Sequence, residues 1–363
     1  MASNRILNKL AFFLLFFIAP ENSLESVWFL KTFRKYPEFF ILLAFILSCY
    51  FFLETQIDKS AFGSQGQLSS LDIIIISFFV SLIIAIVAVI SGVGGGVIFT
   101  PLLLAFTSFD TLLIRSTGLV VAMFSGLIST GPLMKKGLSD IKLVMLGAIP
   151  IIFGGMSGSW LAIYLANNFG QKSDGIVRLS LGILLILIAI IFIINNGKSD
   201  YPKSKSLDLL ASKLKLRKTY WEDSLSMNIS YRASNVKLGI GLFLLIGFTG
   251  GFFGLGGGWA VVPLLNLLMS IPLKVATGTS GVLLAMGNSA AIWPYINAGA
   301  LIGVIAAPWM LGQVIGGIIG ANLLASLKAS AVRGLLIAIL LFSSVKLVVR
   351  GIETLFSIEI PII

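Results

Sequence analysis

Histidine is absent from this chain of 363 residues, and cysteine occurs once, as Cys49. A single cysteine cannot form an internal disulfide, and no histidine or cysteine cluster exists to hold a metal. The commonest general base is missing as well. Only 11% of the residues are charged, whereas a soluble domain carries about 25%. The sequence therefore predicts no enzyme, no catalytic residue, no cofactor and no metal site.

What the sequence has instead is long stretches without a charge. A hydrocarbon core of about 30 Å needs roughly 20 helical residues to cross it. Uncharged runs cover residues 73–109, 116–134, 143–171, 179–197, 238–273, 275–327 and 334–345. They predict an all-α fold, that of a polytopic helical membrane protein.

The N-terminal extension, residues 1–70, is less regular. Residues 10–18 are apolar and follow two basic residues, which fits either a short signal sequence or an interfacial helix; the poor cleavage site favours the helix. Residues 39–53 are the better candidate for a membrane span. The extension is therefore expected to contribute about one membrane helix.

An internal repeat organises the rest of the chain. Gly92-Val-Gly-Gly-Gly is followed by Pro101, and Gly254-Leu-Gly-Gly-Gly is followed by Pro263, at an offset of 162 residues, the difference between 254 and 92. The same offset aligns Pro132 with Pro294, Gly137 with Gly299, and Gly154, Gly155 and Gly158 with Gly316, Gly317 and Gly320. Two such halves, here residues 71–197 and 237–350, are typical of secondary transporter folds.

The basic residues suggest that the two halves are inverted. The linker, residues 198–236, is strongly basic and is expected in the cytoplasm under the positive-inside rule. The run 73–109 is too long for one crossing, so we expect a hairpin that folds at its glycines, and the run 238–273 is expected to form a second hairpin of opposite orientation. Lys346 and Arg350 are exceptions, since this scheme places them outside.

The net charge of +11 does not indicate nucleic acid, because the basic residues lie in loops. In the linker, Leu207, Leu210 and Leu214 would share one face of a helix beside several basic residues. That pattern predicts a helix that lies on an anionic membrane leaflet. Membrane lipid is therefore an expected partner, and nucleic acid is not.

The two triple-glycine loops are the predicted substrate site. Glycine permits positive φ and close approach of the backbone to a ligand, and a helix that restarts after the loop presents free N–H groups that attract an anion. The alternative is that the glycines merely allow close helix packing, which we favour for Gly154, Gly158, Gly316 and Gly320. Inverted hairpins would bring the two loops together near the bilayer midplane.

Polar residues follow each hairpin. They are Arg115, Ser116, Thr117 and Ser125 in the first half, and Thr277, Thr279, Ser280, Asn288 and Ser289 in the second, with Trp259 and Trp293 as further donors. A hydroxyl can instead bond back to its own helix, so each has a purely structural alternative. The predicted substrate-binding residues are Gly94, Gly95, Gly96, Thr117, Gly256, Gly257, Gly258, Thr277, Thr279, Ser280 and Asn288.

The second repeat resembles the TauE/SafE family of membrane transporters. The resemblance rests on residues 254–263, on Ala276-Thr-Gly-Thr-Ser280, and on Pro294 and Gly299, and it covers residues 71–349. The first half departs from this pattern with Arg115-Ser-Thr-Gly118. The resemblance implies transport of sulfite or organosulfonate anions, often as export.

The sequence thus predicts a secondary transporter that moves a small anion, a sulfur oxyanion or organosulfonate, by alternating access. A passive anion channel of the same fold is the alternative. The protein is expected in the cell membrane, with the anion and lipid as partners, and a homo-oligomer is compatible with the sequence.

Overall fold

A computed structural model describes residues 70–91, 94–107, 109–135, 137–194, 202, 208–222, 226–324 and 329–358. The chain divides into two compact units, Met1–Phe45 and Ile46–Ile363, and every described residue belongs to the second. The helices predicted at 10–18 and 39–53 therefore lie outside the described residues.

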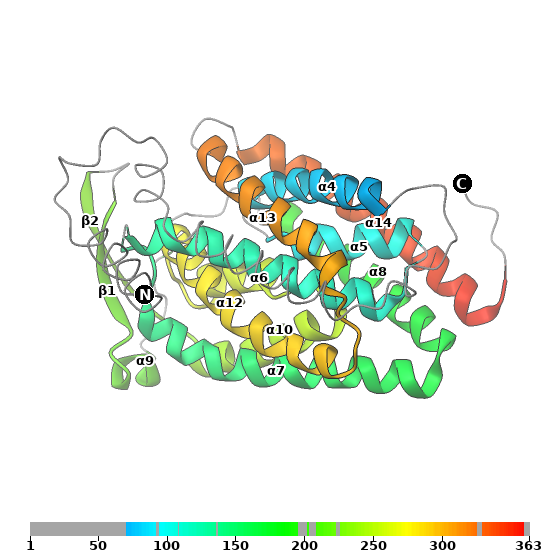
Figure 1. Cartoon of the computed structure of the whole chain (residues 1–363). Helices are drawn as coiled ribbons and strands as arrows, with labels where there is room; N and C mark the ends of the chain where they lie inside the picture. Colours follow the sequence, from blue (N-terminus) through cyan, green and yellow to red (C-terminus); the bar gives the residue numbers. More distant parts are fainter. Residues whose placement is uncertain are drawn as a thin grey trace, which may run out of the picture. The chain divides into compact units, whose positions relative to one another are not determined.

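The described part is almost entirely helical, with one small β-hairpin (Figure 1). Its elements are α4 (Ser70–Ser91), α5 (Gly96–Phe106), α6 (Thr111–Lys135), α7 (Ile141–Phe169), α8 (Gln171–Ile194), α9 (Leu209–Lys213), β1 (Arg217–Glu222), β2 (Met227–Arg232), α10 (Val236–Phe253), α11 (Gly258–Pro263), the π-helix η3 (Leu264–Leu268), α12 (Leu273–Asn297), α13 (Gly303–Leu324) and α14 (Ala329–Phe356).

Five of the described helices are long and apolar enough to cross a membrane: those spanning Thr111–Ile128, Ile141–Phe169, Gln171–Ile191, Val236–Phe253 and Leu273–Asn297. On α7, Met145, Ile149, Phe153 and Trp160 follow one another at spacings of four, four and seven residues and are all exposed. A continuous apolar face of this kind is unfavourable in water and suits lipid. The prediction of an all-α, polytopic membrane protein is confirmed.

Both long uncharged runs break at their glycines, as predicted. The first run gives α4 and α5, and the second gives α10 followed by α11 and η3. At the offset of 162 residues, α4 to α8 correspond in order to α10 to α14. The break positions therefore repeat together with the sequence.

Helix packing exchanges partners between the halves. Helix α7 packs on α10, and α13, its counterpart, packs on α4, as Figure 1 also shows. Helix α6 packs on its own counterpart α12, and α8 packs on α14. Each of these four contacts thus reappears when the two halves are swapped, which is the pattern that a two-fold relation between them would produce.

The small-xxx-small pairs hold these helices close together. A Cβ on Gly154 or Gly158 would collide with the carbonyl oxygen of Leu244 or Phe248 on α10, and one on Gly316 would collide with that of Leu82 on α4. Larger residues would force the helix axes apart. The prediction that these glycines serve helix packing is confirmed.

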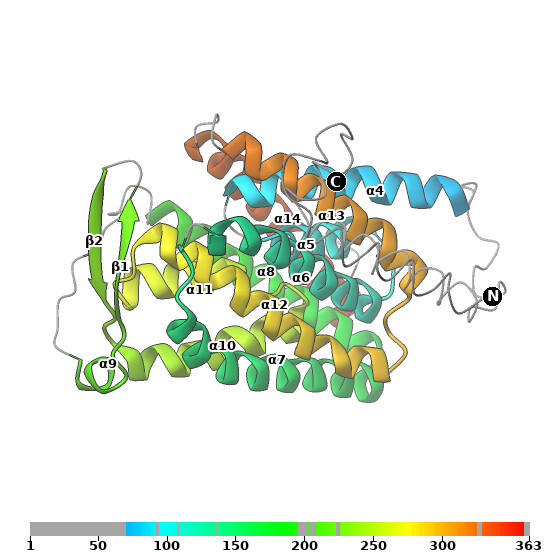
Figure 2. The same cartoon turned by 60° about the vertical axis from the view of Figure 1, so that its left-hand side comes forward.

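The linker differs from what the sequence analysis expected. Helix α9 has only five residues, and it is followed by an antiparallel hairpin in which Arg217 pairs with Arg232 and Glu222 with Met227 (Figure 2). Leu209 and Leu214 are exposed. The helix predicted through Leu207, Leu210 and Leu214 is thus described only over Leu209–Lys213, with Leu207 outside the described residues, and its contact with lipid stays a prediction. The hairpin that follows it was not predicted; β-forming residues on both sides of a turn favour it there.

Charged residues of the hairpin bind groups in both halves of the protein. Lys218 donates from Nζ to the carbonyl oxygens of Gly137 (3.1 Å) and Ser139 (3.0 Å), between α6 and α7. The buried Glu222 carboxylate forms an ion pair with Lys274, at the start of α12. The hairpin therefore connects the first half to the second.

Candidate functional site

The first glycine loop leads directly into α5. Gly94 has a φ of +89°, a backbone conformation that favours glycine. The Gly95 N–H donates to Ser125 Oγ of α6 at 3.1 Å, and the Gly95 carbonyl accepts from Ile98 (3.2 Å) and Phe99 (3.0 Å). The first N–H groups of α5 have no partner within the helix, so they form a partially positive terminus inside the protein.

The second loop has the same plan. Gly254 ends α10 at a φ of +71°, and Gly256 has a φ of +67°. The Gly257 carbonyl accepts from Ala260 (3.1 Å) and Val261 (3.0 Å), which starts α11 at Gly258.

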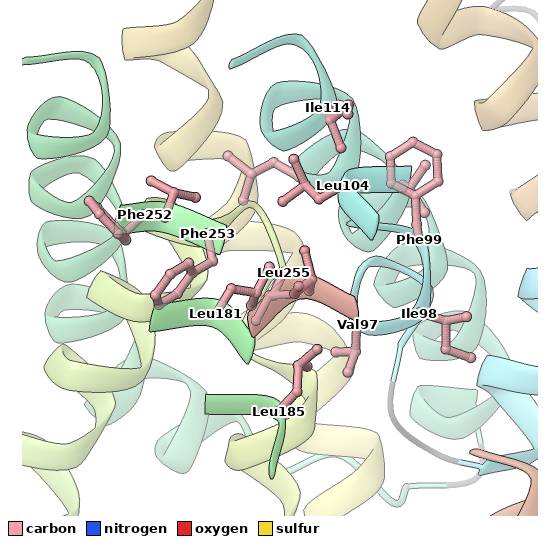
Figure 3. Packing of buried hydrophobic residues seen from close by; sticks show 14 of the residues in the cluster. Val97, Ile98, Phe99, Leu104, Ile114, Leu181, Leu185, Phe252, Phe253 and Leu255 are labelled. Atoms are coloured by element: carbon pink, nitrogen blue, oxygen red, sulfur yellow. The ribbon is translucent and has the colours of Figure 1, made fainter. Parts of the chain in front are cut away.

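The two loops lie against each other. A Cβ on Gly96 would be 2.6 Å from the carbonyl oxygen of Leu255, so only glycine fits there without a shift. Thr100 Oγ1 on α5 donates to the Gly254 carbonyl at 2.7 Å. Figure 3 shows Leu255 among the buried side chains of this junction, which also include Val97 of α5.

One face of α6 supports both loops. Gly118, Val121, Ala122 and Ser125 follow an i, i+3, i+4, i+7 spacing and therefore share this face. Ala122 Cβ would lie 2.8 Å from a Cβ on Gly96 and 2.7 Å from one on Gly256. A side chain added at either glycine would therefore collide with α6, so α6 fixes the position of both loops.

Two amide side chains face the loops. Asn288 of α12 is buried, and its Nδ2 would be 2.9 Å from a Cβ on Gly256. Gln313 of α13 is fully buried, and a Cβ on Gly95 would collide with its Oε1. Neither Asn288 Nδ2 nor Gln313 Oε1 has a hydrogen-bond partner among the described residues.

Arg115 places a positive charge beside the second loop. Its side chain is fully buried. A Cβ on Gly254 would be 2.5 Å from the Arg115 Cα and would also collide with the Arg115 carbonyl oxygen. Its Nε donates to the Thr111 carbonyl at 3.2 Å and its Nη1 to the Phe252 carbonyl at 3.1 Å, at the end of α10. Within the described part of the chain, Nη2 has no partner and no carboxylate pairs with this guanidinium.

The predicted threonines and serine have different environments. Thr117 is buried, and its Oγ1 has no partner among the described residues. Thr279, its repeat counterpart, accepts from the Asp140 N–H at 3.1 Å. Thr277 donates to the Leu273 carbonyl (2.9 Å) and Ser280 to the Thr277 carbonyl (2.8 Å), so both bond back to their own helix.

The structure thus brings together the glycines, Asn288 and the α6 face, while the hydroxyls of Thr277, Thr279 and Ser280 are engaged elsewhere. Gln313 and Thr100 were missed from the sequence. Each is a polar residue flanked by apolar ones in its helix, with no repeat counterpart of the same type: the offset pairs Gln313 with Ile151 and Thr100 with Val262. A polar residue inside an uncharged run was the available signal.

Comparisons with known proteins agree with this picture. The family model described as "Sulfite exporter TauE/SafE" matches residues 77–347. The chain is 26% identical over 287 residues to the "Probable membrane transporter protein YunE" of Bacillus subtilis (strain 168), a match that covers 77% of this chain and 98% of the relative. No solved structure matches the chain. The protein therefore belongs to the sulfite exporter TauE/SafE family of membrane transporters.

Proposed function

We propose that this protein is a secondary transporter that moves a small sulfur oxyanion or organosulfonate, sulfite first among them, by alternating access. The observation that carries the proposal is a set of buried hydrogen-bond donors without acceptors around the glycine loops. They are Arg115 Nη2, Asn288 Nδ2 and, on the first turn of α11, Trp259 Nε1. A buried donor without a partner costs about 1–3 kcal/mol, which an acceptor-rich ligand would recover.

Charge supports an anion over a neutral ligand. The Arg115 guanidinium is completely buried, and its fixed protein contacts are carbonyl oxygens rather than carboxylates. A buried charge without a counter-ion is strongly unfavourable, and a bound anion near the second loop would offset that cost. The N-terminus of α5 adds partial positive charge beside the first loop.

The arrangement of the halves supports alternating access. Transporters with inverted repeats bind substrate where discontinuous helices meet, and they move one repeat against the other around that site. Here both helix breaks meet at Gly96 and Leu255, and the packing partners are exchanged between the halves. We place the two repeats in opposite orientations in the cell membrane, with the linker in the cytoplasm.

Counterflow into liposomes tests the proposal. Purified protein reconstituted into vesicles loaded with unlabelled sulfite should accumulate labelled sulfite transiently, with saturable initial rates. Non-saturating flux without counterflow would indicate the passive channel instead. Flux of neither kind, for sulfite, thiosulfate, sulfoacetate and taurine alike, would contradict the proposed function.

A matched pair of variants tests whether the positive charge of Arg115 contributes to anion binding. Arg115→Gln should weaken sulfite binding at least tenfold, because the buried charge is lost. Lys237→Gln removes an exposed charge in the first turn of α10 and should leave binding unchanged. Equal effects of the two variants would mean that Arg115 acts only through net charge.

A further inference from the structure

Gln313 presents an acceptor, not a donor, to the first glycine loop. Its side chain belongs to α13 and is completely buried. Oε1 is the atom that lies against Gly95, and a Cβ there would also be 2.9 Å from the amide carbon Cδ. The amide head therefore fills the space that a side chain on Gly95 would need.

The orientation of this amide is fixed by Ser81 of α4. Gln313 Nε2 donates to the Ser81 carbonyl oxygen and to Ser81 Oγ, both at 3.2 Å. A carbonyl oxygen can only accept, and the single Ser81 hydroxyl proton is given to the Trp309 carbonyl at 2.6 Å. A flipped amide would set oxygen against two acceptors, so Oε1 must face the loop.

No donor of the described residues satisfies Oε1. The N–H of Gly95, the residue that Oε1 faces, is already bound to Ser125 Oγ at 3.1 Å. A buried amide oxygen without a donor is costly, and a water molecule or a ligand hydroxyl would relieve that cost. Among the unpartnered polar groups beside the loops, Gln313 Oε1 is an acceptor, whereas Arg115, Asn288 and Trp259 offer donors.

We infer that Gln313 is a specificity-determining residue that selects a singly protonated oxyanion, of which hydrogen sulfite is the example. This inference rests on the proposed function. The oxygens of such an anion accept from the donors at the loops, while its O–H donates to Gln313 Oε1. A fully ionised oxyanion, or an alkylsulfonate without a hydroxyl, places a lone pair against Oε1 instead.

Titration of charged residues on the neighbouring helices would not produce the same pH dependence of binding. Helices α4 and α6 pack on α13, and α5 packs on both α4 and α6. Their sequences carry Asp72 near the start of α4 and Arg115 and Lys135 on α6, and α5 and α13 carry no charged residue. Side chains of these types do not ordinarily titrate near neutral pH, where sulfite takes up its proton.

Equilibrium binding to the purified full-length protein tests the inference. Sulfite and methanesulfonate should be titrated across the pH range in which sulfite is protonated; methanesulfonate remains a singly charged anion without a donor throughout. Affinity for total sulfite should fall about tenfold for each pH unit above the ligand's own pKa. Methanesulfonate should bind independently of pH and roughly 5- to 150-fold more weakly than hydrogen sulfite.

The variant Gln313→Met then distinguishes a hydrogen-bonding role of Oε1 from a packing role of the side chain. Methionine is similar in length and removes Oε1, so hydrogen sulfite and methanesulfonate should now bind within about threefold of each other, with methanesulfonate affinity retained. Ile151→Met is the control, because Ile151 is buried at the equivalent repeat position on α7. It should preserve the discrimination of the wild-type protein.

Two results would overturn the inference. If wild-type protein binds both anions equally at every pH, Oε1 is satisfied by water only. If Gln313→Met weakens both anions alike, the residue serves packing. The wild-type pH series decides alone if the variant does not purify as a monodisperse protein. Failure of the proposed function is distinct from either result, since wild-type protein would then bind none of these anions.

Discussion

The Tyr231 hydroxyl donates a 2.7 Å hydrogen bond to Oδ2 of Asp140, a residue 91 positions away in the sequence. Asp140 Oδ1 accepts from the Lys142 N–H at 3.0 Å and so caps α7, while the Asp140 N–H donates to Thr279 on α12 at 3.1 Å. This one aspartate joins the linker hairpin, the first repeat and the second repeat. The hairpin is therefore a structural brace between the halves.

Removing the Tyr231 hydroxyl should loosen the start of α7. Burial first, and the Asp140 charge second, raise the pKa of Tyr231, so the hydroxyl keeps its proton as donor. Tyr231→Phe leaves a buried carboxylate oxygen without this donor, and we expect a loss of about 1.5–3 kcal/mol of stability. Thermal unfolding in detergent, with hydrogen exchange across the first turn of α7, measures it.

Thr219→Ala is the matched control, since Thr219 lies on the same hairpin and its hydroxyl bonds to Ser230 at an exposed position. It should change stability by less than about 0.5 kcal/mol. Equal effects of the two substitutions would mean that the hairpin as a whole, and not the bond to Asp140, sets the stability.

Acid should release the linker from α10 through Asp208. Oδ2 of Asp208 accepts from the Val236 N–H at 2.7 Å, and Oδ1 accepts from Leu210 and Ala211 at 2.8 and 3.2 Å. These bonds, that from Val236 foremost, lower the pKa of Asp208 below its ordinary value. Its stabilising effect is therefore complete above the unfolded-state pKa and is lost as the pH falls through the lower, folded-state value.

Hydrogen exchange over α9 and the start of α10, measured along an acid titration, tests this. In Asp208→Ala the segment should already exchange fast at neutral pH, at a cost of about 1 kcal/mol for the lost cap. Asp110 caps α6 in a similar way, through the Leu112 and Leu113 N–H groups. Asp110→Ala should leave the exchange of the linker segment unchanged; a parallel change would show a global effect.

The helix breaks could be predicted from the sequence because glycine triplets in uncharged runs have few other structural explanations. The packing role of Gly154 and Gly158 followed from spacing alone. The linker hairpin was missed because the leucine spacing at 207–214 was given more weight than the β-forming residues that follow, Thr219-Tyr-Trp221 and Ile229-Ser-Tyr231. Those residues lie on both sides of a turn and were the available signal.

The polar contacts of the site could not be predicted in the same way. Whether Gln313 or Thr277 faces a loop depends on helix rotation, which an apolar sequence on all sides does not determine. The weak preference for one face also explains why Thr277 and Ser280 were assigned to the site although their hydroxyls bond back to α12.

The effect of substituting a loop glycine on stability and binding should depend on the space and the φ angle at that position. In Gly96→Ala the new Cβ would be 2.6 Å from the Leu255 carbonyl oxygen and 2.8 Å from Ala122 Cβ, so the loops must separate. We expect a loss of about 1–3 kcal/mol of stability and at least tenfold weaker anion binding. In Gly94→Ala the space is open, but the φ of +89° costs about 1–2 kcal/mol.

Gly241→Ala on α10 is the control, because no atom lies within 4 Å of its Cβ position and the backbone is helical. It should be neutral or slightly stabilising. Thermal shift and sulfite titration of the three proteins measure the series. Wild-type binding by stable Gly96→Ala protein would place the anion away from the loop junction.

Transport should not need a carboxylate of this protein as a proton relay. Within the five described spans, Asp174 on α8 is the acidic residue, and its Oδ1 accepts from Thr111 Oγ1 at 2.6 Å. Asp110 caps α6 at an exposed position, and Asp140 is held by Tyr231 and Lys142. None of these three faces the glycine loops through a hydrogen bond, so we expect the driving force to act on the anion itself.

Two such forces are available, and they have opposite consequences. The membrane potential contributes about 2.3 kcal/mol per charge per 100 mV and drives an anion out of an interior-negative cell. A proton carried on the anion instead couples its movement to the pH gradient and can serve uptake.

In the double variant Asp110→Asn, Asp174→Asn, sulfite flux into liposomes should keep its response to an imposed potential and to an imposed pH gradient. Asp140 is left intact, because its replacement would also disturb the brace to Tyr231. If the variant binds sulfite normally and responds to potential but has lost pH-driven flux, one of the two carboxylates carries the proton, and the anion does not.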